Sequence, residues 1–314
     1  MSKEKVNNSI FYVLFEGLKI YFSNIDKFLL YMLFPVFGQI IGLVLSLVIP
    51  FALMQTITDK VENPLMALAY LILLAVPGLL IFTKAFWNYL VAYIALNSMT
   101  EGALTSGKVY DFQSHNEVAT RRSFAFILLL LVVGVLSSVG STIFFMIPGF
   151  VVWVYLILVF QVFTFEPDLN ISEIFKRSFN LVKGNWFRTF LILAFLSFFS
   201  IYIISQGFAV IFDFLNLTTL ICGKLDEYTS LLPLELVNDF LNYFNLQNIT
   251  PAMISHVILS CVLTFLVMGL TLPIRSICWT LWYVNLSQMK LSAGSKDKPK
   301  TAKTSRRKPV DREE

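Results

Sequence analysis

The sequence predicts an all-α polytopic membrane protein with about six transmembrane helices, on the basis of three observations. First, 57% of the 314 residues are hydrophobic and only 14% are charged, whereas an ordinary soluble domain is nearer half apolar and about a quarter charged. Second, several long stretches carry almost no charge. Third, lysine and arginine are distributed unevenly between these stretches.

The apolar stretches have the lengths of membrane crossings. A helix of roughly 20 apolar residues crosses a hydrocarbon core about 30 Å thick, and its backbone groups are bonded internally. Residues 123–165 carry no charge and are about twice the length of one crossing. Ile147-Pro148-Gly149 near their middle favours a turn, so we expect two spans joined by a hairpin. The four single spans are expected at residues 28–54, 64–99, 189–212 and 252–287.

The basic residues predict the orientation. Under this topology, 20 of the 24 lysines and arginines lie on the side that holds both termini. The opposite side holds only Lys60 and Lys224, and two more cations lie within spans. Because positively charged residues are retained in cytoplasmic loops, we expect both the N-terminus and the C-terminus in the cytoplasm.

Two segments outside the spans predict amphipathic helices at the cytoplasmic interface. Residues 9–23 place apolar side chains at helical spacing, with Glu16 and Lys19 off that stripe. Residues 171–183 begin at a capping-box pattern of Asn170 and Glu173, and Lys183-Gly184 is typical of a helix end. These helices either brace the bundle or offer a docking surface to a partner. Residues 1–290 then form the transmembrane domain, and residues 291–314 a disordered basic cytoplasmic tail.

One segment resembles a known group of proteins. The acidic turn that begins at Phe165-Glu-Pro-Asp and the following Ile174-Phe-Lys-Arg-Ser-Phe-Asn-Leu-Val-Lys-Gly-Asn-Trp-Phe-Arg188 resemble a motif of uncharacterised bacterial six-helix integral membrane proteins. That family is related to the membrane domain of some glycerophosphodiester phosphodiesterases. The resemblance covers roughly residues 86–290. It implies a fold and a location in the bacterial cytoplasmic (inner) membrane, with no activity to carry over, because the chain has no stretch large enough for the phosphodiesterase barrel.

The sequence offers no recognisable catalytic or metal centre. Hydrolases and metal enzymes need clustered His, Cys, Asp or Glu, or a nucleophile beside a base. His115 in a polar loop and His256 near the outer end of the last span each stand alone, and the three cysteines are widely spaced. We therefore expect no enzyme activity, no cofactor, no metal and no nucleic-acid partner. We also expect no phosphate-binding glycine loop and no Gly-x-x-x-Gly packing motif in the spans.

Lys84 and Arg275 are the candidate contacts for an anionic lipid or substrate. Each is a cation within a predicted span, where charge is costly and usually faces a partner, a cavity or the interface. One interpretation is that both side chains extend to the inner headgroup layer, since the two spans are longer than a crossing. The other is that they flank a shared site for an anionic group such as a lipid phosphate.

Two functions are compatible with these features. The first is a non-enzymatic envelope support protein that binds membrane lipids or other membrane proteins. The alternative is a transporter or permease for a small or lipid-like anion, with Lys84 and Arg275 in the path. A transporter needs a polar cavity that reaches mid-bilayer, whereas a lipid-binding scaffold needs a packed apolar bundle with grooves that open to lipid. The sequence does not predict an oligomeric state.

Overall fold

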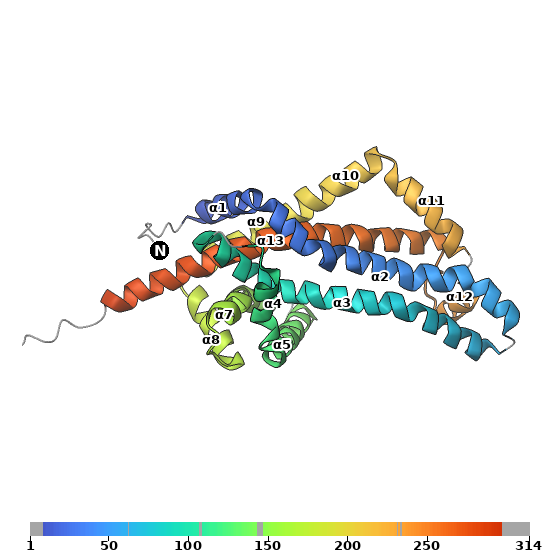
Figure 1. The fold of residues 1–314 in the computed structure, drawn as a ribbon, viewed down its shortest axis with the longest axis horizontal. Helices are drawn as coiled ribbons and strands as arrows, with labels where there is room; N and C mark the ends of the chain where they lie inside the picture. The colour runs from blue at the N-terminus through green and yellow to red at the C-terminus, as the bar shows by residue number, and fades with distance from the viewer. Residues whose placement is uncertain are drawn as a thin grey trace, which may run out of the picture.

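The structure is a computed structural model that describes residues 9–61, 63–106, 109–142, 147–230, 232 and 234–296. Within these ranges every regular element is helical, so the all-α prediction is confirmed (Figure 1). The elements are α1 (Ile10–Ser23), α2 (Ile25–Lys60), α3 (Pro64–Thr105), α4 (Phe112–Thr120), α5 (Ser123–Thr142), α6 (Ile147–Leu156), α7 (Val159–Phe165), α8 (Ile171–Val182), α9 (Trp186–Phe198), the π-helical η1 (Phe199–Ser205), α10 (Gln206–Phe214), α11 (Leu217–Thr229), α12 (Leu234–Tyr243) and α13 (Pro251–Lys296).

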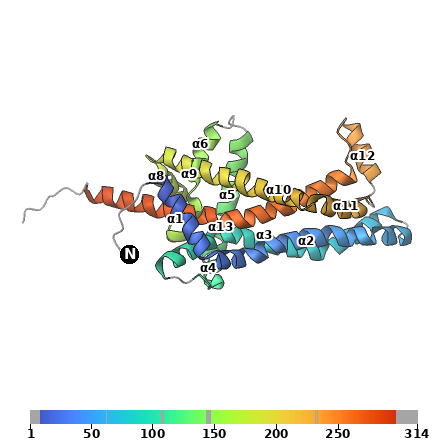
Figure 2. The same cartoon turned by 90° about the horizontal axis from the view of Figure 1, so that it is seen from above.

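Three long helices, α2, α3 and α13, run side by side along the molecule (Figures 1 and 2). The 42 residues of α3 extend roughly 63 Å at 1.5 Å per residue, about twice the thickness of a hydrocarbon core. By length and composition, four helical segments are able to cross a membrane. They are Ile25–Leu47, Leu65–Thr105, Trp186–Phe214 and Pro251–Met289.

The region predicted as a hairpin of two spans is arranged differently from the long helices. α5 and α6 pack against each other and run across the direction of α2, α3 and α13 (Figures 1 and 2). α4 and the first part of α5, Ser123–Leu136, together are long and apolar enough for one candidate span, but they are bent by 72°. α6 and α7 form a shorter apolar stretch, Gly149–Phe165. The fold thus offers four or five candidate spans among its described residues, and a sixth crossing stays a prediction.

Glycines hold α2 and α3 in close contact. A Cβ on Gly38 would lie 2.7 Å from the Ala85 Cβ, and one on Gly42 would overlap the backbone nitrogen of Phe82. From the opposite helix, a Cβ on Gly78 would overlap the backbone nitrogen of Ser46. Gly38 and Gly42 are a Gly-x-x-x-Gly pair, whose small side chains let helix backbones approach closely. The expectation that the spans lack this motif is therefore wrong.

The remaining predicted segments also form helices. The expected span at residues 189–212 is built from α9, η1 and α10, so a π-helical turn interrupts it. The connection at residues 213–251 contains α11 and α12. α13 continues through Lys296, beyond the boundary expected at residue 290. The rest of the predicted tail, residues 297–314, lies outside the described residues.

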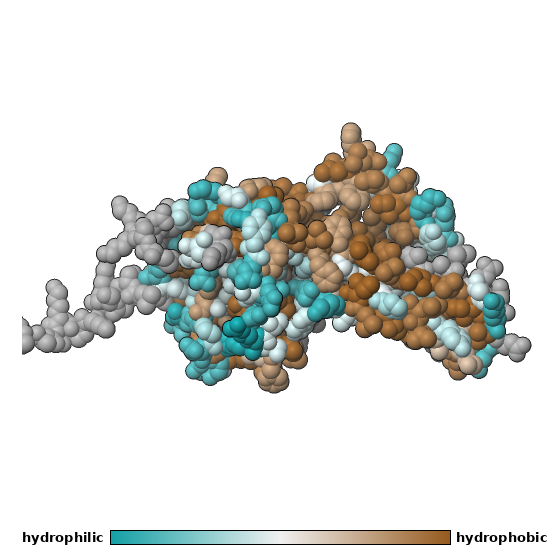
Figure 3. All heavy atoms as spheres, viewed as in Figure 1, coloured by the Kyte–Doolittle hydropathy of each residue, from teal (hydrophilic) through white to brown (hydrophobic). Residues whose placement is uncertain are grey.

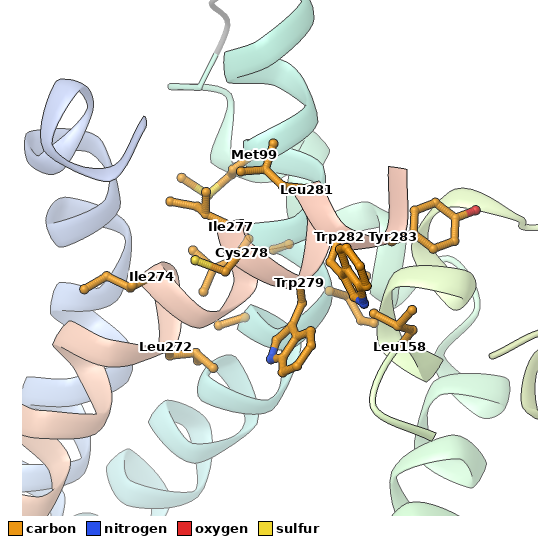
Figure 4. Close-up of a cluster of buried hydrophobic side chains, with 14 of the residues drawn as sticks. Met99, Leu158, Leu272, Ile274, Ile277, Cys278, Trp279, Leu281, Trp282 and Tyr283 are labelled. Carbon is orange, nitrogen blue, oxygen red and sulfur yellow. The ribbon is translucent and has the colours of Figure 1, made fainter. Parts of the chain in front are cut away.

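Hydropathy divides the surface along the long axis. Apolar residues cover α10 and the stretches of α2 and α3 on the right of the view (Figure 3). Hydrophilic residues gather around α4 and α8 at one end and around α11 at the other. The packed core lies toward the α4 and α8 end, where α13 contributes Ile277, Cys278 and the fully buried Trp282 (Figure 4).

Candidate functional site

The interior of the bundle contains a hub of amide and hydroxyl side chains centred on Asn97. The Asn97 Oδ1 accepts hydrogen bonds from Ser276 Oγ at 2.5 Å, Gln161 Nε2 at 3.2 Å and Thr280 Oγ1 at 3.3 Å. Its Nδ2 donates to Thr164 Oγ1 at 3.2 Å. Because Asn97 is fully buried and its partners come from α7 and α13, the hub fixes the register of three helices. It holds no titratable group and so supplies no acid or base.

Sequence reasoning missed this hub, although a signal for it exists. Gln161 and Thr164 are three residues apart, and Ser276 and Thr280 are four apart, so each pair shares a helix face. Isolated polar residues in apolar helices commonly hydrogen-bond across helices. Their common partner, Asn97, lies near the end of another expected span.

A second polar cluster joins the C-terminal end of α7 to α8 and α13. The Arg177 Nε donates to both carboxylate oxygens of Glu166, at 2.8 and 3.0 Å, and the Tyr283 hydroxyl donates to Glu166 Oε1 at 2.7 Å. Nearby, the Arg122 guanidinium lies 4.6 Å from the centre of the Phe163 ring. These contacts use residues of the Phe165–Arg188 motif to attach α8 to the bundle, which is a structural role.

At the start of α2, the carboxylate of Asp26 and the ammonium of Lys27 both contact Tyr110, which lies just before α4. The Tyr110 hydroxyl donates to Asp26 Oδ2 at 2.7 Å, and the Lys27 Nζ lies 4.9 Å from the centre of the Tyr110 ring. The Lys27 Nζ also donates to Asn24 Oδ1 at 3.0 Å. The hydrogen bond to Asp26 raises the pKa of Tyr110, with smaller contributions from burial and the negative charge, because the bond is lost when the phenol ionises.

An apolar groove begins at Asp26 and follows the seam between α2 and α13. Its volume is about 350 Å³. From Asp26 to Phe37 it extends roughly 16 Å at 1.5 Å per residue, close to the thickness of one hydrocarbon leaflet. Leu30, Leu33 and Phe37 are about half exposed along it. Its lining is Asp26, Leu29, Leu30, Met32, Leu33, Val36 and Phe37 of α2 and Leu266, Gly269 and Leu270 of α13.

A second groove of about 340 Å³ lies between α6 and α8. Leu156, Phe175 and Phe179 supply apolar lining, and Lys176 and Asn180 add polar groups. The Phe179 ring stacks on Tyr155 with 4.4 Å between centroids. Two of its five lining residues are polar, whereas Asp26 is the one polar residue in the lining of the groove along α2.

The two predicted contact residues, Lys84 and Arg275, occupy different depths in the bundle. Lys84 is exposed on α3, next to the Ala85 that packs on Gly38. Arg275 is half-buried on α13, six residues beyond Gly269, whose position packs on Val36. Gly38 and Val36 are two residues apart on α2. With a rise of 1.5 Å per residue, these contacts separate Lys84 from Arg275 by roughly 13 Å along the bundle. Neither forms an ion pair with a described residue, and their role as anion contacts stays a prediction.

The histidines and cysteines have partners that the sequence did not reveal. His115 is buried on α4, a helix rather than the expected loop, and its Nδ1 lies 3.0 Å from Ser98 Oγ. His256 was expected to stand alone, but its Nδ1 lies 3.7 Å from Cys222 Sγ. Burial, followed by the charge of Asp226, raises the pKa of Cys222, the reverse of what activates a thiol nucleophile. Among the described residues, no group of three or more His, Cys, Asp or Glu is placed to bind a metal.

Comparison with known proteins gives no family assignment. No protein-family model matches the chain, and neither the curated proteins nor the solved structures contain a match. The resemblance carried by residues 165–188 therefore stays a prediction.

Proposed function

We propose that this chain is a multi-pass protein of the bacterial cytoplasmic membrane that binds membrane lipid in a surface groove and catalyses no reaction. The observation that carries the proposal is the groove between α2 and α13. It is apolar for roughly the depth of a leaflet, it opens at the surface, and a charged residue lies only at its end. An acyl chain placed there exchanges contact with other lipids for packing against leucine and phenylalanine side chains.

The membrane topology is part of this proposal. In it, the four long candidate spans cross the bilayer and the apolar band between the two hydrophilic ends contacts hydrocarbon; the division of the surface in Figure 3 supports this placement. The α5 and α6 hairpin either adds two crossings, as its sequence predicts, or enters and leaves the membrane on one face. Both arrangements contain an even number of crossings, so the distribution of lysine and arginine keeps both termini cytoplasmic.

A cysteine at Phe150, near the tip of that hairpin, separates the two arrangements. The Phe150→Cys variant, with Cys222, Cys261 and Cys278 replaced by alanine, is treated in intact cells with a membrane-impermeant maleimide. Labelling from outside supports six crossings. Labelling only after the membrane is opened supports a hairpin that stays on the cytoplasmic side.

The rival function, a transporter for an anion, receives less support from the geometry. It needs a polar path through the bundle, with Lys84 and Arg275 along it. The central polar residues instead bond to one another around Asn97, and the two described grooves are on the surface. The two cations also lie at different depths.

Lipid retention in native mass spectrometry tests the proposed function. We expect the full chain, purified from membranes in mild detergent, to carry bound phospholipid. Leu33→Trp fills the groove with a larger side chain and should reduce the bound fraction at least several-fold. Leu73→Trp is the matched control, because Leu73 is 64% exposed on α3 and does not line the groove. Equal loss, or no loss, in the two variants contradicts the proposal.

A further inference from the structure

We propose that the groove between α2 and α13 selects phospholipids whose headgroup carries a primary ammonium together with a phosphate, as phosphatidylethanolamine does. Asp26 binds the ammonium, and Lys27 binds the phosphate. This inference rests on the proposed function, since it names the lipid class for the same groove.

A charged residue lies at one end of the groove, where a lipid headgroup would lie. Asp26 is itself part of the groove lining, at the end of the run of apolar side chains. A lipid whose acyl chain follows Leu29, Leu33 and Phe37 therefore has its headgroup at Asp26. Because Lys27 is the next residue and both side chains contact Tyr110, a carboxylate and an ammonium are presented together at that place.

Asp26 and Lys27 have the capacity for further hydrogen bonds. An ionised carboxylate has about four acceptor sites, and a lysine ammonium has three donors. Tyr110 bonds to Asp26 Oδ2, and the Lys27 Nζ donates to Asn24. Asp26 and Lys27 therefore retain acceptor and donor capacity toward a ligand. A primary ammonium donates hydrogen bonds to a carboxylate, and a phosphate oxygen accepts them from lysine.

The same two charges discriminate against other lipids. A lipid with a net negative headgroup, such as phosphatidylglycerol, brings no cation to Asp26 and places its phosphate beside a carboxylate. The same pairing of opposite charges that attracts the zwitterionic headgroup thus disfavours the anionic one. Both residues lie at the surface, where a single ion pair contributes little because solvent and salt screen it. We therefore expect a preference of about threefold to fivefold.

The site differs from the one predicted around Lys84 and Arg275. Two cations favour an anionic lipid, whereas a cation and an anion favour a zwitterionic lipid. The headgroup preference of the bound lipid consequently distinguishes the two sites. If Leu33→Trp, which fills the groove, abolishes this headgroup preference, the preference belongs to the groove.

The experiment is a competition between phosphatidylethanolamine and phosphatidylglycerol of the same acyl composition, measured by native mass spectrometry of the full chain in detergent. We expect the wild type to favour phosphatidylethanolamine about threefold to fivefold. Asp26→Asn, which still accepts a hydrogen bond from Tyr110, should reduce or reverse the preference. Lys19→Gln is the charge control: Lys19 is 73% exposed on α1 and pairs with Glu16, and its replacement should leave the preference unchanged. Thermal unfolding of each variant checks folding.

The outcomes separate this inference from the proposed function. Equal binding of the two lipids, or a preference that Asp26→Asn leaves unchanged, overturns the headgroup assignment. If Leu33→Trp still reduces binding in that case, the groove binds lipid without selecting this headgroup, and the proposed function stands. If Leu33→Trp affects neither lipid, both the inference and the proposed function are wrong.

Discussion

The Sγ of Cys278 lies 2.6 Å from the position that a Cβ on Gly17 would occupy. This contact joins α1 to α13, and both residues are buried. The Cα and Cβ of Cys278 are each 3.8 Å from the same position, an ordinary van der Waals distance. The sulfur atom is thus the one atom of Cys278 that would be too close to the Cβ of an alanine at position 17.

Gly17→Ala should therefore destabilise the chain by about 1–3 kcal/mol, as overpacking of a core does. Cys278→Ala added to it should restore most of that loss, because removal of the sulfur makes room for the new methyl group. The measurement is thermal unfolding in detergent for both single variants and the double variant, analysed as a double-mutant cycle. Gly223→Ala is the control, since nothing lies within 4 Å of its added Cβ. Additive effects in the cycle would refute the contact.

A substitution in the contact between α2 and α3 should destabilise the chain more than Gly17→Ala does. A Cβ on Gly42 meets the backbone of Phe82, and backbone atoms cannot rotate away as a side chain does. Gly42→Ala should separate the two helices and reduce stability toward the upper end of the same range, about 3 kcal/mol. Gly134→Ala, which meets nothing within 4 Å, should be neutral or slightly stabilising. If both variants unfold at the wild-type temperature, the close packing described for α2 and α3 is incorrect.

Replacement of Asn97 should break several polar contacts at once. Asn97→Ala removes the acceptor shared by Ser276, Gln161 and Thr280, and buried donors without partners cost about 1–3 kcal/mol. Ser276→Ala in the same chain should recover part of the loss, because it removes one of those donors. Thermal unfolding of the two single variants and the double variant measures the coupling. If the double variant loses as much stability as the two single variants lose together, the hub does not act as a unit.

The stability that the Tyr110 hydroxyl contributes should depend on pH in the alkaline range. Its pKa is raised by the bond to Asp26, so the bond contributes stability that is complete below the ordinary tyrosine pKa of about 10 and is lost as the pH rises through the folded-state value. The difference in unfolding temperature between the wild type and Tyr110→Phe should thus be constant from pH 7 to 9 and should shrink above pH 10. A difference that grows with alkalinity would contradict this sign.

The sequence predicted features that depend on local cues. The capping box of α8 is one: Asn170 Oδ1 accepts from the Glu173 backbone N–H at 3.0 Å, and Glu173 Oε2 accepts from the Asn170 backbone N–H at 2.9 Å. The helix then ends at Val182, and Gly184 follows with a positive φ of 89°. The long apolar runs likewise produced α2, α3 and α13 near their expected places.

Features that depend on the relative placement of helices were not predictable in the same way. α4 was expected as a polar loop, but Asp111 caps its first turn, and Ser98 and Tyr31 bond to His115 and Asn116. These partners come from distant parts of the sequence. The charge-free run at residues 123–165 predicted two helices but contained no information on their direction, because apolarity is the same for a helix along the bundle and for one across it. The groove beside Asp26 also exists only once α13 lies against α2.

Membrane insertion is the claim on which the account depends, and alkaline carbonate extraction tests it most directly. Membranes from cells that express the full chain are washed with carbonate at high pH and centrifuged beside a known integral protein and a known peripheral protein. We expect the chain to remain in the pellet with the integral protein, because its apolar helices have no partner in water. Its recovery in the supernatant with the peripheral protein would contradict the account.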